Sequence, residues 1–551
     1  MRLLILSMLI ASAASAQTPK VVLADSERQA ALNSEIASEN FQAKLDVISR
    51  SERYPGNDAL LLISGKMSFP VRYQLIDIAK KSIIVSTFSL FAGERDGQIE
   101  DPSTRLMVEK LIAAKRRGVD VRMIIDGFSS ALTGAKSAIN VLRDAGIDIV
   151  KYNPVVHQNF ELNWFTGLPH FLYRFVVLQN PTTNRWHEKT LVVDGQYAVI
   201  GGLNWGEHYR DGNNFSSAVN DVTDFYQHPL IRDIRLPPRG QWGASDPDAW
   251  RDTDVLVRGP VVAAVVKQLL LDFSILDVLH DKPRSGQYKN ASEQDYANAE
   301  VLFAIHFEDD PAFFAETTSP ALSSGVQARY VSQRPFLERR RSASIAAMRK
   351  YAEQNELYVH AENPLLGISN LYVNLINKAE KQILWGSHAN RPTPVMMEAL
   401  VAAAKRGVQI FLIGNSPESA EALPGNGKFL YRKASGLYDE LLSRGGGNIR
   451  LFEWRRDMNI DGRIVRGGAF HSKVFSVDGL ITSVGPYNVS KASFGKHTEG
   501  TMVIIDPEFA RQTEQMFQHD LEFSREVTRT EITIDPERQQ LRAIARSRYR
   551  H

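Results

Sequence analysis

The sequence reads Trp-His-Glu-Lys-Thr-Leu-Val-Val-Asp-Gly at residues 186–195, and a matching stretch, Phe-His-Ser-Lys-Val-Phe-Ser-Val-Asp-Gly, stands at residues 470–479. Both stretches have the pattern His-x-Lys-x4-Asp. Each is followed by a β-rich run and then by Gly-x-x-Asn, at residues 201–204 and 485–488. One such pattern arises by chance in roughly a few per cent of chains this long. Two copies with the same sequel indicate a duplicated functional unit.

The residues around each motif predict a strand, a tight turn and a returning strand. Side chains two apart in a strand point to the same face, so the His and Lys of each motif share a face. The Asp-Gly pairs at 194–195 and 478–479 favour a hairpin turn. The returning strands, expected at 197–200 and 481–484, end at the Gly-x-x-Asn runs. We therefore expect His, Lys and Asn to converge at one edge of a sheet.

A repeated helix–strand pattern precedes each motif. Residues 75–83 and 375–383 both carry apolar residues at helical spacing and then a β-rich run. A second helix follows in each half, starting with a capping residue and Pro at 101–102 and 393–394. The pattern predicts an α/β fold of two duplicated sandwich halves, with mixed, largely parallel sheets flanked by helices. The halves are expected to be related by a pseudo-two-fold axis, with the active site at their interface.

Changes in sequence pattern divide the 551 residues into segments. Arg2, a short apolar run and Ala14-Ser15-Ala16 match a secretory signal, which predicts a periplasmic or secreted protein. The competing interpretation, a buried N-terminal helix, leaves the cleavage pattern unexplained. The expected segments are a signal peptide (1–16), an N-terminal segment (17–54), the first half (55–281), a linker with helical elements (282–359), the second half (360–525) and a basic tail (526–551).

The composition sets bounds on stability and partners. Hydrophobic residues make up 43% and charged residues 23%, which is ordinary for a globular protein. Cysteine is absent, so disulfides are excluded and the core must supply the stability. The formal net charge of +2 gives no general case for nucleic-acid binding.

The residue types of the two motifs suit attack on a phosphodiester. Lys and Asn side chains can hold the non-bridging oxygens and neutralise the charge that develops on them. One imidazole can attack phosphorus and form a phosphohistidine. A second imidazole can protonate the leaving alcohol and then deprotonate the incoming water or alcohol. This chemistry needs two histidines around one phosphate, and it needs neither a metal nor another cofactor.

On these motifs the sequence resembles the phospholipase D superfamily, and it is most similar to bacterial phospholipase D-like and cardiolipin synthase-type enzymes. The likeness covers residues 55–280 and 360–525 and includes the run Gly-Leu-Asn-Trp-Gly-Glu-His-Tyr at 202–209. The resemblance implies that His187 is the nucleophile and His471 the general acid/base. It also implies a set of residues that bind the substrate phosphate, namely Lys189, Lys473, Asn204 and Asn488.

The resemblance further implies acids downstream of each motif that orient the histidines. In this chain they are Asp252 and Glu499, with Asp221 and Asp224 as competitors of Asp252 for the first of these places. Such a carboxylate fixes the imidazole tautomer and favours imidazolium. The two motif aspartates, Asp194 and Asp478, come after the strand, so we expect them to support the turn and the hydrogen bonds of the site.

Two classes of substrate remain open. The first is a phospholipid at a membrane surface, whose phosphatidyl group passes to water or to an alcohol. The second is a nucleic acid, because the superfamily includes metal-independent nucleases; the near-neutral charge makes this less favoured. A degenerate binding domain is disfavoured because both His-x-Lys pairs are retained. Aromatic residues at 155–186 fit equally a lip that receives acyl chains and a packed loop. We expect a monomer that is internally a pseudo-dimer.

Overall fold

The structure is a computed structural model, and it describes residues 18–152, 184–210, 222–236, 249–280, 292–314, 325–335, 337–338, 341–423, 427–460, 463–534, 536 and 538–540. Within these residues, fifteen strands form one continuous sheet through both halves. Their order is β17-β11-β10-β9-β14-β15-β16-β8-β1-β7-β6-β5-β2-β3-β4. Neighbouring residues along a strand point to opposite faces of the sheet. Both faces carry apolar side chains, and helices cover both.

The strands of the first half are β1 (Tyr54–Leu62), β2 (Ser82–Thr87), β3 (Asp120–Asp126), β4 (Asp148–Tyr152), β5 (Lys189–Val193), β6 (Tyr197–Gly201) and β7 (Asp254–Arg258). Those of the second half are β8 (Val326–Gln333), β9 (Gln382–Gly386), β10 (Gln409–Asn415), β11 (Ile449–Trp454), β14 (Val474–Val477), β15 (Ile481–Val484), β16 (Glu499–Ile505) and β17 (Ser524–Val527). A separate two-stranded ribbon consists of β12 (Asp457–Ile460) and β13 (Arg463–Arg466).

The helices up to the end of the first half are α2 (Asp25–Ala31), η1 (Glu35–Ala37), α3 (Glu39–Ser49), α4 (Gly65–Ile78), α5 (Pro102–Arg116), α6 (Gly127–Leu132), α7 (Lys136–Asp144), α9 (Glu207–Arg210), α10 (Val222–Gln227), α11 (Pro229–Ile234) and α12 (Val261–His280). The later helices are α13 (Glu293–His306), α14 (Ser342–Gln354), α15 (Gly367–Lys378), α16 (Pro394–Lys405), α17 (Pro417–Ala420), α18 (Gly427–Ser435), α19 (Tyr438–Arg444), α20 (Lys491–Gly495), α21 (Pro507–Glu522) and α22 (Arg529–Ile534). None of the described helices has the length and apolar character that crossing a membrane requires.

The strand order confirms the pseudo-two-fold arrangement. From the β1–β8 pair outward, β7, β6, β5, β2, β3 and β4 in one direction match β16, β15, β14, β9, β10 and β11 in the other. The axis therefore passes between β1 and β8, which pair antiparallel. Helix α12 follows β7, and helix α21 follows β16. Both helices pack in the one hydrophobic core that contains strand residues from both halves.

The sheet is mixed, as expected, but it is mostly antiparallel, so the prediction of largely parallel sheets is wrong. Parallel pairing is confined to the outer strands β2-β3-β4 and β9-β10-β11, where helices connect consecutive strands. The Asp-Gly turns instead return the chain at once, which makes β5–β6 and β14–β15 hairpins. A hairpin pairs its strands antiparallel.

The predicted helix starts are confirmed. The Asp101 side chain accepts a hydrogen bond from the Thr104 amide at the start of α5. The Thr393 hydroxyl does the same for the Met396 amide at the start of α16. These caps satisfy backbone groups that would otherwise lack partners in the first helical turn.

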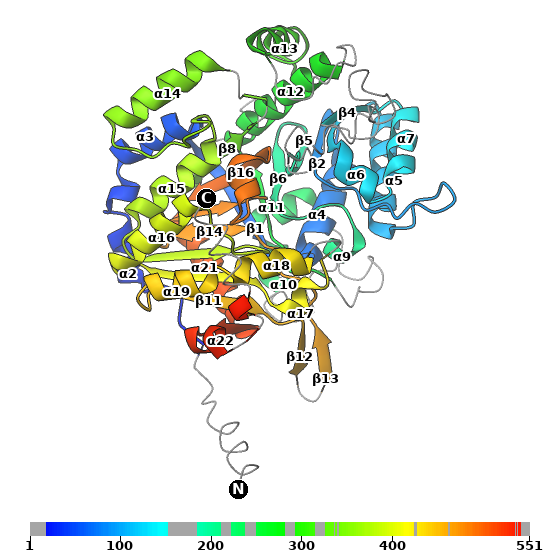
Figure 1. Ribbon diagram of the computed structural model, residues 1–551. Coiled ribbons are helices and arrows are strands. Elements are labelled where there is room, and N and C mark those ends of the chain that lie inside the picture. Colours follow the sequence, from blue (N-terminus) through cyan, green and yellow to red (C-terminus); the bar gives the residue numbers. More distant parts are fainter. Residues whose placement is uncertain are drawn as a thin grey trace, which may run out of the picture.

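The stretch 282–359, expected to be a linker with helical elements, also contains a central strand. Helices α13 and α14 are the helical elements, and β8 between them pairs with both β1 and β16. The N-terminal α3 packs against α15 of the second half (Figure 1). In the basic tail, buried Arg538 pairs with Glu453 at 2.9 Å. The two halves are therefore joined by a shared sheet as well as by the chain that connects them.

Candidate active site

The first motif places its histidine immediately before β5. His187 is 7% exposed, and its Nδ1 lies 2.9 Å from Oε1 of Glu499, the first residue of β16. The same oxygen accepts a hydrogen bond from the Ser493 hydroxyl at 2.9 Å. The His187 amide donates to the Thr498 carbonyl at 2.8 Å. The second half therefore fixes both the backbone and the ring of this histidine.

The second motif repeats this arrangement with the halves exchanged. His471 stands before β14 and is 9% exposed, and its Nδ1 lies 2.6 Å from Oδ2 of Asp252 in the first half. The His471 amide donates to the Arg251 carbonyl at 2.7 Å. Each half thus supplies the carboxylate that orients the histidine of the other half. A carboxylate on Nδ1 favours the tautomer that leaves Nε2 free.

This geometry resolves the competition among the candidate acids. Asp252 faces His471 rather than the motif that it follows in the sequence, and Glu499 likewise faces His187. Asp224 lies in α10, and Asp221 lies outside the described residues. The crossed pairing could not be read from the order of the residues along the chain.

The two motif lysines each lie against the histidine of their own motif and are almost fully buried. Lys189 Nζ donates to the His187 carbonyl at 3.0 Å and lies 4.8 Å from the centre of the Phe88 ring. Burial, and then the charge of Lys473, lower the pKa of Lys189 well below its usual value. Burial lowers the pKa of Lys473 to about 8, although Asp252 and Glu499 oppose the shift. Two crowded, poorly solvated ammonium groups form a strong site for an anion.

Both histidines are held in the neutral form. Burial lowers the pKa of His187 well below its usual value, and Lys189 and His497 add to the effect. Burial, and then Lys473, lower the pKa of His471 in the same direction. The charges that act on His187 include Lys473 and His471, so the two half-sites influence each other electrostatically. A neutral imidazole has the free lone pair that a nucleophile or a base requires.

In the second half-site, the two groups that contact the histidine have pKa values near neutral pH. Burial raises the pKa of Asp252 to about 7, against the opposing charge of Lys473. Lys473 Nζ also lies 2.5 Å from His471 Nδ1, which is the atom that contacts Asp252. With one proton, Nδ1 can donate to Asp252 or accept from Lys473, but not both. The three groups therefore share protons and titrate together.

The two asparagines lie beside these rings. Asn204 Nδ2 donates to the Tyr209 hydroxyl at 2.8 Å, and Tyr209 packs edge-on against His471 at 5.4 Å between ring centres. Asn488 Oδ1 lies 2.5 Å from Nδ1 of His388, whose ring stacks on His471 at 5.6 Å. Both amides are 2% exposed and are oriented by these partners. The structure thus brings all the predicted His, Lys and Asn residues together with Asp252 and Glu499.

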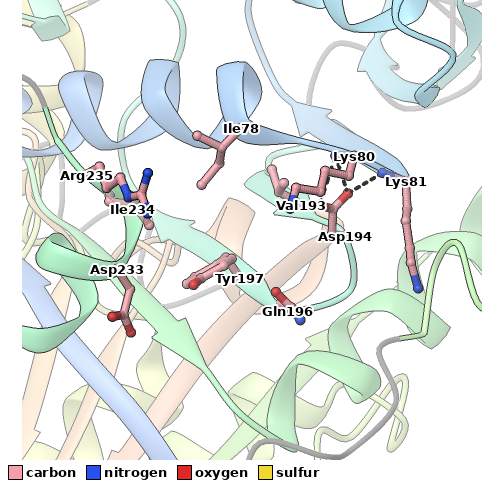
Figure 2. Close-up of a pocket in the computed structure, with 10 residues that line it drawn as sticks. All are labelled: Ile78, Lys80, Lys81, Val193, Asp194, Gln196, Tyr197, Asp233, Ile234 and Arg235. Carbon is pink, nitrogen blue, oxygen red and sulfur yellow. Dashed lines mark hydrogen bonds between the residues drawn. The ribbon is translucent and has the colours of Figure 1, made fainter.

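The two motif aspartates lie at the other ends of the strands. Asp194 accepts from the amides of Lys80, Lys81 and Ser82 at 2.8 to 3.1 Å, and the first two of these residues are drawn in Figure 2. Asp478 accepts equivalent bonds from residues 380–382. Both aspartates have positive φ, 52° and 53°, and so does the Gly that follows each, as the central pair of a tight turn of this kind requires. Three residues, 194–196 and 478–480, connect the paired strands. The predicted support of the turn is confirmed, whereas a contribution to the hydrogen bonds around the histidines is not observed.

A cavity of about 640 Å³ lies at this far end of β5 and β6 (Figure 2). Asp194, Gln196 and Tyr197 line it, and none of its lining residues is a motif histidine or lysine. Since a strand rises about 3.3 Å per residue, the full length of β5 separates this cavity from His187. We therefore place the active site at the histidines.

Sequence reasoning missed the rings that flank the two histidines. Phe88 packs edge-on against His187 at 4.8 Å, and His388 takes the matching place beside His471. The ring centre of His497 lies 4.8 Å from that of His187, and the ring centre of Trp250 lies 5.3 Å from that of His471. Extending the repeat of 75–83 and 375–383 by five residues pairs positions 88 and 388, so one signal was present.

The aromatic segment at 155–186 falls almost entirely outside the described residues. At its end, Trp186 is fully buried, and its Nε1 donates to the Ser86 hydroxyl at 2.8 Å. Its neighbour Arg185 is buried and pairs with Asp126 at 3.2 Å. These two residues belong to the core of the first half.

Comparisons with known proteins agree with this arrangement. A family model described as "Cardiolipin synthase, PLD-like domain" matches residues 73–227 and 372–521, together more than half of the chain. Cardiolipin synthase A of Pseudomonas putida is 25% identical over 508 residues, which cover 91% of this chain and 76% of that protein. Probable cardiolipin synthase YwiE of Bacillus subtilis is 23% identical over 471 residues, which cover 85% and 67%.

A solved structure gives independent support for the fold. The phosphatidylserine synthase of Haemophilus influenzae Rd KW20 superposes with a TM-score of 0.55 and covers 92% of this chain and 98% of its own. The sequence identity is 13%, so this likeness concerns the fold alone.

Proposed function

This chain belongs to the cardiolipin synthase, PLD-like domain family, and from that premise we propose that it is a metal-independent phosphatidyltransferase or phosphodiesterase that acts on phospholipids through a phosphohistidine. The observation that carries the proposal is the crossed pairing of two buried histidines with two carboxylates around two buried lysines. The names of the relatives, cardiolipin synthases, favour lipid over nucleic acid as the substrate.

His187 acts as the nucleophile. Glu499 accepts a hydrogen bond from Nδ1–H of His187, so the lone pair of the neutral ring is on Nε2. Nε2 attacks phosphorus, the P–N bond forms, and the bond from phosphorus to the leaving alcohol oxygen breaks. Lys189 and Lys473, with the amides of Asn204 and Asn488, hold the non-bridging oxygens as negative charge develops.

His471 acts as the general acid and then as the general base. When Nδ1 accepts from Lys473, the ring proton is on Nε2; His471 gives this proton to the leaving alcohol while Nδ1 takes up a proton from Lys473 or Asp252. In the second step it takes a proton from water or an acceptor alcohol, whose oxygen attacks phosphorus while the P–N bond breaks. Water yields phosphatidate, and an alcohol yields a new phospholipid. The free histidine and the shared proton are restored at the end of each cycle.

The substrate class can be tested by identifying the products. Purified protein without residues 1–16 is incubated with mixed phospholipid vesicles, with and without added glycerol or phosphatidylglycerol, and with plasmid DNA in a parallel sample. We expect phosphatidate in the absence of an alcohol and transfer products in its presence, identified by mass spectrometry. Cleavage of DNA with no change in the lipids would instead establish the nuclease alternative.

Export of the protein is a separate proposal that rests on residues 1–16, which lie outside the described residues. The Ala-x-Ala pattern at 14–16 places the mature start at Gln17. N-terminal sequencing of the protein from a bacterial host should give Gln17 in the exported fraction. A chain that retains its first sixteen residues in every cell fraction would contradict the proposal.

A further inference from the structure

The side of the active site that carries His187 holds a third ring nitrogen. His497 Nδ1 lies 3.6 Å from Oε1 of Glu499, and the same oxygen lies 2.9 Å from His187 Nδ1. One ligand atom from each of the three residues falls within 4.8 Å of the other two. Two imidazoles and one carboxylate form a donor set that is typical of zinc sites.

Two atoms of this cluster are left without partners. In the described part of the chain, neither Nδ1 of His497 nor Oε2 of Glu499 has a hydrogen-bond partner, and both atoms are buried. The Glu499 side chain is 0% exposed. A buried polar atom without a hydrogen-bond partner lowers the stability of the fold, and binding of an ion is among the standard explanations for such an atom. These orphan atoms are the second, independent sign of a ligand.

We propose that a Zn²⁺ ion binds reversibly to His187, His497 and Glu499 and switches the enzyme off. Zinc accepts imidazole nitrogens at about 2.0–2.1 Å and carboxylate oxygens at about 2.0–2.2 Å, with water as a further ligand. The three ligand atoms need to close by less than about 1 Å to meet one ion at these lengths. Zinc needs no redox partner, and it binds mixed nitrogen and oxygen donors well.

The inhibition follows from the tautomer of His187, and this part of the inference rests on the proposed function. In the active form, the single ring proton is on Nδ1 and faces Glu499, so the Nε2 lone pair is free. A metal ion that binds Nδ1 of His187 needs the lone pair of Nδ1, so the ring proton must leave Nδ1. The ring then carries its proton on Nε2, which can no longer attack phosphorus.

The pseudo-two-fold axis provides a built-in comparison. The position that matches His497 in the other half-site is Trp250, which offers no metal-binding atom to His471 and Asp252. His388 also lies beside His471, but its Nδ1 is engaged by Asn488. The metal site is therefore expected on one side of the active site alone, and His388 is the matched control for His497.

Zinc binding to the purified protein tests the site without any substrate. Isothermal titration with Zn²⁺, and the visible spectrum of the Co²⁺ form, should show one ion bound per chain with micromolar affinity. His497→Phe should weaken binding by roughly 100-fold, while His388→Phe should leave it unchanged. His497→Gln serves as a second variant if the first is unstable, and circular dichroism checks the fold of each.

Activity gives the second readout. Micromolar Zn²⁺ should inhibit the enzyme, a chelator should restore full turnover, and His497→Phe should remain active in the presence of zinc. Affinity no tighter than millimolar, or equal binding by His497→Phe, would overturn the site. Zinc bound by the wild-type protein without any loss of turnover would overturn the switch. A protein that binds zinc but has no activity on lipids would count against the proposed function and leave the site standing.

Discussion

The two half-sites have the same backbone arrangement and differ in the side chains that surround the histidine. In both, a histidine precedes a hairpin strand, a lysine follows two residues later, and the opposite half supplies the carboxylate. His187, however, has Phe88 and His497 as flanking rings, whereas His471 has His388 and Trp250. The duplicated fold provides two equivalent histidines, and these neighbours make them chemically different.

The clearest difference concerns proton exchange. Nδ1 of His471 contacts both Asp252 and Lys473, whose pKa values are moved to about 7 and about 8. Nδ1 of His187 contacts the Glu499 oxygen that also accepts from the Ser493 hydroxyl, and Lys189 donates to the His187 backbone carbonyl. Groups that titrate near neutral pH suit a general acid/base, and an imidazole held neutral suits a nucleophile. The comparison therefore assigns transfer of protons to the second half-site and attack to the first.

Removal of the two histidines should have the largest effect and should separate their roles. His187→Ala and His471→Ala should each lower turnover of phospholipid by about 10⁴- to 10⁶-fold, since nucleophile and acid act as a unit. A nitrophenyl phosphodiester needs no protonation of its leaving group. His471→Ala should therefore still release one equivalent of nitrophenolate in a stopped-flow burst, and His187→Ala should release none. The reverse pattern would exchange the two roles.

Neutralising the carboxylates should have the next largest effect. Asp252→Asn and Glu499→Gln should each lower kcat by about 10²- to 10⁴-fold with little change in KM, because each fixes the tautomer of a histidine. Only Asp252→Asn should also alter the acid side of the pH profile, because Asp252 shares its proton with His471. Equal pH profiles for the two variants would contradict the difference between the half-sites.

The pH dependence of the wild-type enzyme should be bell-shaped. Burial raises the pKa of Asp252 to about 7, so kcat should rise as pH increases through this value and the carboxylate ionises, because the second step needs His471 as a base. Burial lowers the pKa of Lys473 to about 8, so kcat/KM should fall above this value as the phosphate-binding charge is lost. Steady-state kinetics from pH 5 to 10 measure both limbs, and about a tenfold fall per pH unit is expected on each side. A Lys473→Arg variant that retained the alkaline limb would assign that limb to another group.

The turn aspartates should affect stability rather than chemistry. Asp194→Ala and Asp478→Ala should each lower the free energy of unfolding by about 1–3 kcal/mol, because three backbone amides lose their acceptor. The loss should be larger for Asp478, which is 1% exposed and lies in the more deeply buried turn. Urea denaturation measures the loss, and kcat near the wild-type value is the control. A large fall in kcat in a stable variant would return these residues to the active site.

Local features of this fold followed from the sequence because their causes are local. A cap needs one side chain and the next three amides, as at Asp101, and a tight hairpin needs Asp-Gly between two short strands. The positions of the His, Lys and Asn residues followed from the strand period and from the repeat. Apart from the repeat, each of these inferences spans fewer than about twenty residues, which is the range over which such patterns act.

The remaining features depend on contacts between distant residues. His187 and Glu499 are 312 residues apart, and His471 and Asp252 are 219 apart, so no local pattern reveals their pairing. Strand β8 was missed because Arg329 and Gln333 interrupt its apolar pattern. Both are buried, and Arg329 is accommodated by Asp46 at 3.0 Å, a residue of the N-terminal segment. The parallel expectation failed because the helical crossovers were weighted above the hairpins in the centre of the sheet.

Trapping of the covalent intermediate tests the two roles most directly. Wild-type and His471→Ala protein are quenched in base after brief exposure to a phosphodiester with a good leaving group, and the modified peptide is mapped by mass spectrometry. The mechanism predicts an acid-labile phospho-adduct on His187 in both proteins, longer-lived in His471→Ala because the base for the second step is missing. An adduct on His471 in the wild-type protein, or on a serine in either, would contradict the division of labour between the half-sites.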